Sequence, residues 1–122
     1  MNNMTKGQLE AKISEAMIKF EKEFMGRGPI ETVTYIIKDA VLVRLKSVLT
    51  PAEEQLAKTS EGAELVKEIR TQLLEGARAL LGNIIIEITK CRIKSLHSDI
   101  STRTGERIIV FVLDRDLEIK FI

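Results

Sequence analysis

The sequence predicts a single α+β domain, a two-layer sandwich in which helices cover one face of a four-stranded antiparallel sheet. Three observations support this fold. The apolar patterns follow the order helix, two strands, two helices, two strands, that is α-β-β-α-α-β-β. The two strands of each pair are close together in the chain, which is typical of antiparallel hairpins. The 122 residues can bury one sizeable core, so we expect residues 1–122 to form one domain.

A first helix is predicted at residues 6–25. Its apolar residues recur at spacings of three and four, with mostly Glu and Lys between them, so they form one stripe. The stripe consists of Leu9, Ile13, Met17, Phe20 and Phe24. Thr5 can cap the first turn. The Gly-Arg-Gly-Pro turn at residues 26–29 ends the helix, because glycine accepts a left-handed conformation and proline cannot continue a helix.

Four strands are predicted, in two hairpins. The first two, at residues 31–37 and 41–48, consist of β-branched and apolar residues around a polar break. The last two, at residues 92–100 and 106–113, flank a turn rich in Ser, Thr and Gly. The final strand is apolar on both faces, which places it centrally. Because helices cover only one face of the sheet, we expect a homodimer formed through the other.

Two helices are predicted between the hairpins. Thr50, Pro51 and Glu53 form a start signal for a short helix at residues 51–58. A longer principal helix follows, and we expect it to break or end between residues 82 and 90. Its buried side is predicted to carry Leu65, Ile69, Leu73, Ala77, Leu80, Ile84 and Ile88.

The charge balance argues against nucleic acid as a partner. The 19 Lys and Arg residues and 18 Asp and Glu residues leave a net charge of +1. A basic band on the sheet remains an alternative, because some RNA-binding sheets use one. It would consist of Arg44, Lys46, Arg92 and Lys94. With four Phe, one Tyr and no Trp, however, the chain has few aromatic residues on which bases could stack.

A cytoplasmic location is expected. No apolar run approaches the roughly 20 residues of a membrane span, and the N-terminal residues lack the pattern of a signal peptide. Cys91 is the single cysteine, which excludes an internal disulfide and suits a reducing compartment. We expect Cys91 to be a packed small residue rather than a nucleophile.

His97 and Asp99 are the most suggestive pair in the sequence. Alternation along a strand places them on the same face, where a carboxylate could orient the imidazole as a general base or metal ligand. The alternative is that the only histidine bonds to a neighbour at a strand end. Ser95 completes a set of serine, histidine and aspartate, but a catalytic triad normally draws on separate segments. We therefore predict no catalytic residue, no metal ligand and no cofactor.

The other candidate binding residues lie in turns. Arg27 could hold an anion or a partner's carboxylate, and the second hairpin turn could bind an anion or serve only as a turn. The predicted binding set is therefore His97, Asp99, Ser101, Arg103, Arg107 and Arg27.

Three strings resemble the bacterial MpsC family. They are GRGP at residues 26–29, LTPAE at residues 49–53 followed by QLAKTSEG, and LHSDISTRTGER at residues 96–107 followed by FVLDRD. The resemblance extends from about Thr5 to Asp116. Some members are named as the third component of a sodium-translocating, membrane-potential-generating system. The resemblance therefore implies a cytosolic accessory to a membrane-protein complex, peripheral at the inner membrane face, and it assigns no functional residue.

Two functions from different classes follow. We expect a non-enzymatic accessory or regulatory domain that acts through the 97–107 hairpin and the 26–29 turn, since recognition residues usually lie in loops on a rigid scaffold. The alternative is a small-molecule or anion-binding domain or enzyme. In that case His97, Asp99 and Arg103 would group at a pocket that a second subunit completes.

Overall fold

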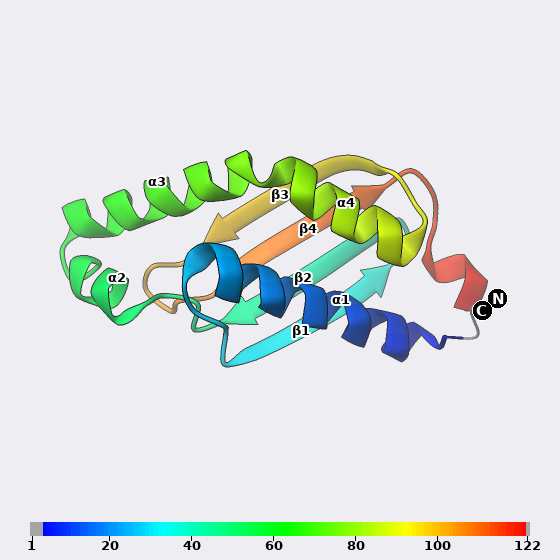
Figure 1. Ribbon diagram of the computed structural model, residues 1–122, viewed down its shortest axis with the longest axis horizontal. Helices are drawn as coiled ribbons and strands as arrows, with labels where there is room; N and C mark the ends of the chain where they lie inside the picture. The colour runs from blue at the N-terminus through cyan, green and yellow to red at the C-terminus, as the bar shows by residue number, and fades with distance from the viewer. Residues whose placement is uncertain (1–3, 122) are drawn as a thin grey trace.

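The computed structural model describes residues 4–121 and shows a four-stranded antiparallel sheet with helices on one face (Figure 1). The strands are β1 (Glu31–Ile37), β2 (Ala40–Lys46), β3 (Ile93–Ile100) and β4 (Arg107–Leu113), in the spatial order β1-β2-β4-β3. The helices are α1 (Lys6–Phe20), α2 (Pro51–Leu56), α3 (Ser60–Gly76) and α4 (Arg78–Thr89). The predicted α+β class and element order are confirmed.

Local signals in the sequence set several of the helix ends. Thr5 caps α1 and Thr50 caps α2, and in each case the residue three positions later bonds back to the cap. The first helix continues past α1 as a π-helical segment, η1 (Glu21–Met25), and ends at Gly26 with φ 91°. The described chain ends in a short 3₁₀ helix, η2 (Glu118–Phe121).

The core lies between the sheet and the helices. β4 pairs with β2 on one side and β3 on the other, so the predicted central position of the last strand is confirmed. Its inward residues pack among the apolar side chains of α1 and α4. Central core residues include Ile109, Phe111, Val43, Leu45, Leu9, Ile13, Met17, Leu81 and Ile85. Cys91 is also buried in this core, as a free thiol.

The predicted principal helix is wrong in two respects. The break lies earlier than expected, at Ala77, where α3 and α4 meet, whereas the end at Thr89 lies within the predicted range of residues 82–90. The buried side of α3 is also different, because it carries Val66, Arg70 and Leu74, whereas the predicted Leu65, Ile69 and Leu73 are 44–47% exposed. The physical reason is Arg70, which turns inward to reach buried carboxylates.

The sheet face opposite the helices keeps apolar residues. Tyr35, Ile37 and Ile108 are exposed there, and Leu42 and Val110 are half-buried between them. The homodimer expected through this face stays a prediction. None of the helices in residues 4–121 combines the length and the apolar character that a membrane span requires.

Candidate functional site

Four charged side chains from four different elements meet inside the protein. Glu21 comes from η1, Glu53 from α2, Arg70 from α3 and Arg107 from β4. Glu21, Arg70 and Arg107 have side chains 0–2% exposed, and that of Glu53 is 21% exposed. We call these four residues the buried charge cluster.

Arg70 lies at the centre of the buried charge cluster. Its Nε and Nη2 donate to the two oxygens of Glu53 at 2.8 and 2.6 Å, which is the bidentate geometry that guanidinium favours. Its Nη1 donates to Glu21 at 3.0 Å, and Nη2 also donates to the carbonyl of Val48 at 2.8 Å. Arg70 thereby joins α3 to α2, to η1 and to the segment after β2.

The environment changes the pKa values of the cluster. Burial raises the pKa of Glu21 above its usual range, against the opposing effect of Arg107 and Arg70. Burial alone would also raise the pKa of Glu53, but hydrogen bonds from Arg70 and from the backbone of Thr50 outweigh it and lower the pKa. Burial lowers the pKa of Arg107 despite the nearby Glu21. Glu21 and Arg107 are therefore the two members whose charged forms burial disfavours most.

Arg107 differs from Arg70 because most of its donors are unused. Its Nη1 donates to Ser98 Oγ at 3.2 Å, and its Nε lies 3.4 Å from Glu21 Oε2 without the geometry of a hydrogen bond. Within residues 4–121, Nη2 has no hydrogen-bond partner. A buried guanidinium group with free N–H groups is unusual, because leaving such donors unpaired is unfavourable.

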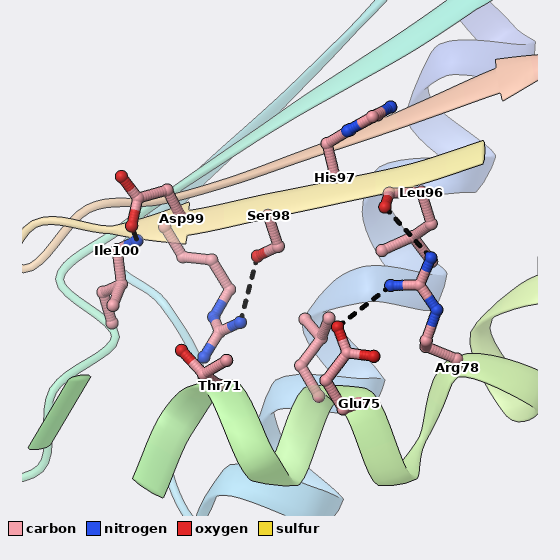
Figure 2. Close-up of a pocket in the computed structure, with 10 residues that line it drawn as sticks. Thr71, Glu75, Arg78, Leu96, His97, Ser98, Asp99 and Ile100 are labelled. Atoms are coloured by element: carbon pink, nitrogen blue, oxygen red, sulfur yellow. Dashed lines mark hydrogen bonds and ion pairs between the residues drawn. The ribbon is translucent and has the colours of Figure 1, made fainter. Parts of the chain in front are cut away.

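A hollow of about 260 Å³ lies beside Arg107, between the helices and β3. Figure 2 shows Thr71, Glu75 and Arg78 on the helix side, with Leu96 and Ser98 of β3 pointing toward them. Arg78 donates to Glu75 Oε1 and to the carbonyl of Leu96, both at 3.1 Å. The hollow therefore combines two guanidinium groups with two hydroxyls and two carboxylates.

His97 and Asp99 lie at the rim of this hollow, and their side chains point away from the helices (Figure 2). They share the face that strand alternation predicts, but each bonds to a different residue. His97 Nε2 lies 3.0 Å from Ser95 Oγ, whereas Asp99 pairs with Lys67 at 3.2 Å and accepts from its neighbour's backbone N–H. The carboxylate therefore does not orient the imidazole.

The remaining predicted residues line two other hollows. Asp99, Ser101 and Arg103 line one of about 410 Å³, and Arg103 also lines one of about 400 Å³ together with Arg27. Arg27 is not free, since it donates to the carbonyl of Leu49 at 2.7 Å and lies 3.7 Å from Glu54. The structure thus brings Arg27 and Arg103 together at one hollow. It places the Arg107 side chain apart from them, between the sheet and the helices.

The basic band, which the sequence left as an alternative, does not form across the sheet. β4 lies between β2 and β3, so apolar Ile108 and Val110 separate the two halves of the band. Arg44 also pairs with Glu106 at 2.7 Å, and Lys46 with Glu31 at 3.5 Å. Among residues 4–121, no three His, Cys, Asp or Glu side chains are grouped in a way that could hold a metal ion.

Sequence reasoning missed Glu21, Arg70, Arg78 and Ser98. One signal was present for Arg70, which continues the four-residue spacing from Val66 to Leu74 and so lies in an apolar series. Glu21 offered no such signal, because glutamates are frequent on all the polar faces of this chain.

The fold and site define a small α+β protein whose layers are joined by buried charges beside a polar hollow. The chain belongs to the MpsC family, because the family model described as "Na+-translocating membrane potential-generating system (MpsC)" matches residues 5–115. The predicted resemblance is thereby confirmed.

Two curated relatives come from Bacillus subtilis (strain 168). The uncharacterised protein YbcI is 42% identical over 114 residues, which cover 93% of this chain and 92% of YbcI. The uncharacterised protein YrhF is 29% identical over 109 residues, which cover 82% of this chain and 83% of YrhF. No solved structure matches the chain.

Proposed function

We propose that this chain is a non-enzymatic accessory domain of the cytoplasm that docks, through the outer face of α3, onto a basic helical segment of a membrane ion-translocating system. The description of the family as a Na+-translocating membrane potential-generating system supports the membrane context.

The observation that carries the proposal is a line of exposed aliphatic side chains on α3. Leu65, Ile69 and Leu73 follow at intervals of four, so they lie along one side of the helix, and we call them the α3 stripe. Single exposed apolar residues are common, but a contiguous line of them is typical of a binding surface. An amphipathic partner helix recognises such a surface with residues at the same spacing.

The helix layer also has an apolar hollow that suits a partner helix. It has a volume of about 540 Å³ and lies between the end of the first helix and α4. Phe20 and Phe24 line it with their rings 5.2 Å apart, opposite Leu80 and Ile84. Phe24 is 52% exposed, so apolar surface remains available there.

The charges around these surfaces favour a basic partner. Glu64 and Glu68 directly precede the first two residues of the α3 stripe, about 100° around the helix, and both are exposed. Glu23 and Glu87 line the apolar hollow together with Lys19, so its charged lining is acidic by one charge. Carboxylates beside apolar residues complement an amphipathic segment that carries Lys and Arg. Cytoplasmic segments close to membrane spans are rich in these residues.

The partners of His97 and Asp99 support the absence of catalysis. A general base of this kind needs a group that orients the imidazole. Here the histidine bonds to Ser95 and the aspartate to Lys67, so the pair is not assembled.

Photo-crosslinking in living cells of the source bacterium tests the proposal. A photoreactive amino acid at Ile69 should give an adduct in the membrane fraction, and the crosslinked peptide should be rich in Lys and Arg. Replacing Glu64 and Glu68 by lysine should abolish the adduct, because the charges then repel. A photoreactive group at Lys12, on the exposed polar side of α1, is the control. Adducts only with a second copy of the chain or with non-membrane proteins would contradict the proposal.

A further inference from the structure

We propose that the hollow between α3 and β3 is a binding site for a small oxyanion, a carboxylate or a phosphate, which the guanidinium group of Arg107 holds through its unpaired N–H groups. This site is independent of the α3 stripe, so either proposal can fail without the other.

The first argument is the donor count of Arg107. A guanidinium group has five N–H donors, and the structure assigns Arg107 one hydrogen bond, to Ser98 Oγ. The Arg107 side chain is 2% exposed and forms part of the wall of the hollow. Two oxygens of a carboxylate or phosphate can accept from adjacent N–H groups of a guanidinium in parallel, which is the strongest pairing open to it.

The second argument is the set of groups around Arg107. Ser98 Oγ accepts from Arg107, so its own O–H proton remains to donate to a ligand oxygen. In Figure 2 the dashed line at Ser98 marks this bond, and the Ser98 side chain points toward α3. Arg78 lines the same hollow and uses only two of its nitrogens, on Glu75 and on a backbone carbonyl. Cationic and hydroxyl donors thus surround one small space.

The charges that face the hollow limit the ligand. Arg107 shares its charge with Glu21, and Arg78 is paired with Glu75. Asp99 at the rim is paired with Lys67. The surroundings are therefore close to neutral, so hydrogen bonding rather than excess positive charge would drive binding. We expect a dissociation constant of about 1 mM and a preference for a singly charged oxyanion.

The size of the hollow points in the same direction. Its volume of about 260 Å³ lies just below the range typical of sites for drug-sized ligands, which is roughly 300–1,000 Å³. A hollow of this size suits a carboxylate or phosphate with a short substituent.

Nuclear magnetic resonance titration with sodium acetate and, separately, sodium phosphate tests the site, with sodium chloride at matched ionic strength as the reference. Saturable shifts of the backbone amides of Ser98 and Thr71 are expected with at least one oxyanion and not with chloride. Acetate alone would identify a carboxylate ligand, phosphate alone a phosphate, and both a simple oxyanion site.

Two serine variants locate the bound anion. Ser98→Ala removes one hydroxyl donor and should weaken binding roughly three- to tenfold. Ser101→Ala, in the turn that lines the neighbouring hollow, should leave the affinity unchanged. Ser98 is an exposed residue, so the Ser98→Ala variant should fold. Arg107→Lys disturbs the buried charge cluster, so it serves only as a supplementary variant.

Four results would overturn the proposal, and three of them concern where and how shifts appear. These are equal shifts with chloride, shifts confined to residues outside the hollow, and an affinity that depends on Ser101 rather than on Ser98. The absence of saturable shifts up to about 50 mM of either oxyanion would overturn it as well, and ordered water would then satisfy Arg107.

Discussion

Replacing Arg70 by methionine tests the buried charge cluster most directly. Methionine retains the apolar length of the side chain but removes the charge and all of its donors. The structure gives Arg70 two hydrogen bonds to Glu53, one to Glu21 and one to the carbonyl of Val48. After the substitution, Arg107 at 3.4 Å is the one cation of residues 4–121 that still pairs with Glu21, which is 0% exposed.

The expected cost is large for a protein of this size. Removing one partner of a buried ion pair typically costs about 3–5 kcal/mol, and a whole domain is stable by only about 5–15 kcal/mol. At about 4 °C per kcal/mol for a chain of this length, Tm should fall by about 12–20 °C.

The cost should also depend on pH. Burial already raises the pKa of Glu21, and losing Arg70 raises it further. Above the usual value of 4.5 the folded variant then holds more protons than its unfolded state, so its stability falls as the pH rises. Arg70→Met should therefore lose more stability at about pH 8 than at about pH 5.

Urea unfolding followed by circular dichroism at both pH values measures the cost. Lys67→Met on the same helix is the control, because it removes only the exposed pair with Asp99 and should change stability by less than about 0.5 kcal/mol. Adding Glu21→Gln to Arg70→Met should recover part of the loss, because the unpaired charge disappears. A loss below about 1 kcal/mol at both pH values would refute the reasoning, as Glu21 would then not need its partner.

Three further predictions concern the helices. Changing the whole α3 stripe to glutamine should alter the unfolding free energy by less than about 1 kcal/mol, whereas Leu74→Ala on the buried side should lower it by about 2–5 kcal/mol. Urea titration measures the unfolding free energy of both variants. Gly62→Ala should lower Tm, because a Cβ would lie 1.8 Å from the carbonyl oxygen of Leu56, whereas Gly76→Ala meets nothing within 4 Å and should stabilise by up to about 1 kcal/mol. Glu53→Gln should make the free energy of unfolding depend less on pH at acidic pH. The lowered pKa of Glu53 contributes stability above about 4.5, and this is lost as the pH falls through the folded value, which urea unfolding at about pH 3–6 would show.

Much of the fold could be predicted because its signals are local. Thr50, which caps α2, and Glu53, which bonds back to the cap, lie three residues apart, and both of the predicted cap hydrogen bonds form. The central position of β4 followed from apolar residues on both of its faces. These inferences need only neighbours in the chain, so distant contacts do not overturn them.

The rotation of α3 could not be predicted, because distant residues decide it. The sequence offers two apolar series on this helix, and the bulkier one, the α3 stripe, is the one left outside. Arg70 turns inward to partners 17 and 49 residues away, Glu53 and Glu21. The periodicity of a helix cannot show that the fold places carboxylates from other elements beside an arginine.

The candidate site was predicted in part. Alternation along β3 correctly placed His97 and Asp99 on one face, but their partners depend on the three-dimensional structure. Lys67 of α3 forms the ion pair with Asp99, so the packing of α3 against β3 decides which side chain pairs with the Asp99 carboxylate. A pocket beside His97 and Asp99 was one of the two expectations, but its lining was predicted wrongly: Arg107 forms the inner wall in place of Arg103, because the sequence grouped Arg107 with the turn residues.

The buried charge cluster and the α3 stripe are connected by the same residue. If position 70 were apolar, both sides of α3 would carry apolar series and burial alone would favour the bulkier one. The charge of Arg70 therefore selects the rotation that exposes the α3 stripe, which is a use of buried polar groups for specificity rather than for stability. In Arg70→Met the helix should become free to turn, and a cysteine placed at position 69 should react more slowly with a thiol reagent than in the otherwise wild-type protein. An unchanged labelling rate would mean that Val66, Leu74 and the break at Ala77 already fix the rotation, and that the cluster contributes only to the joining of the layers.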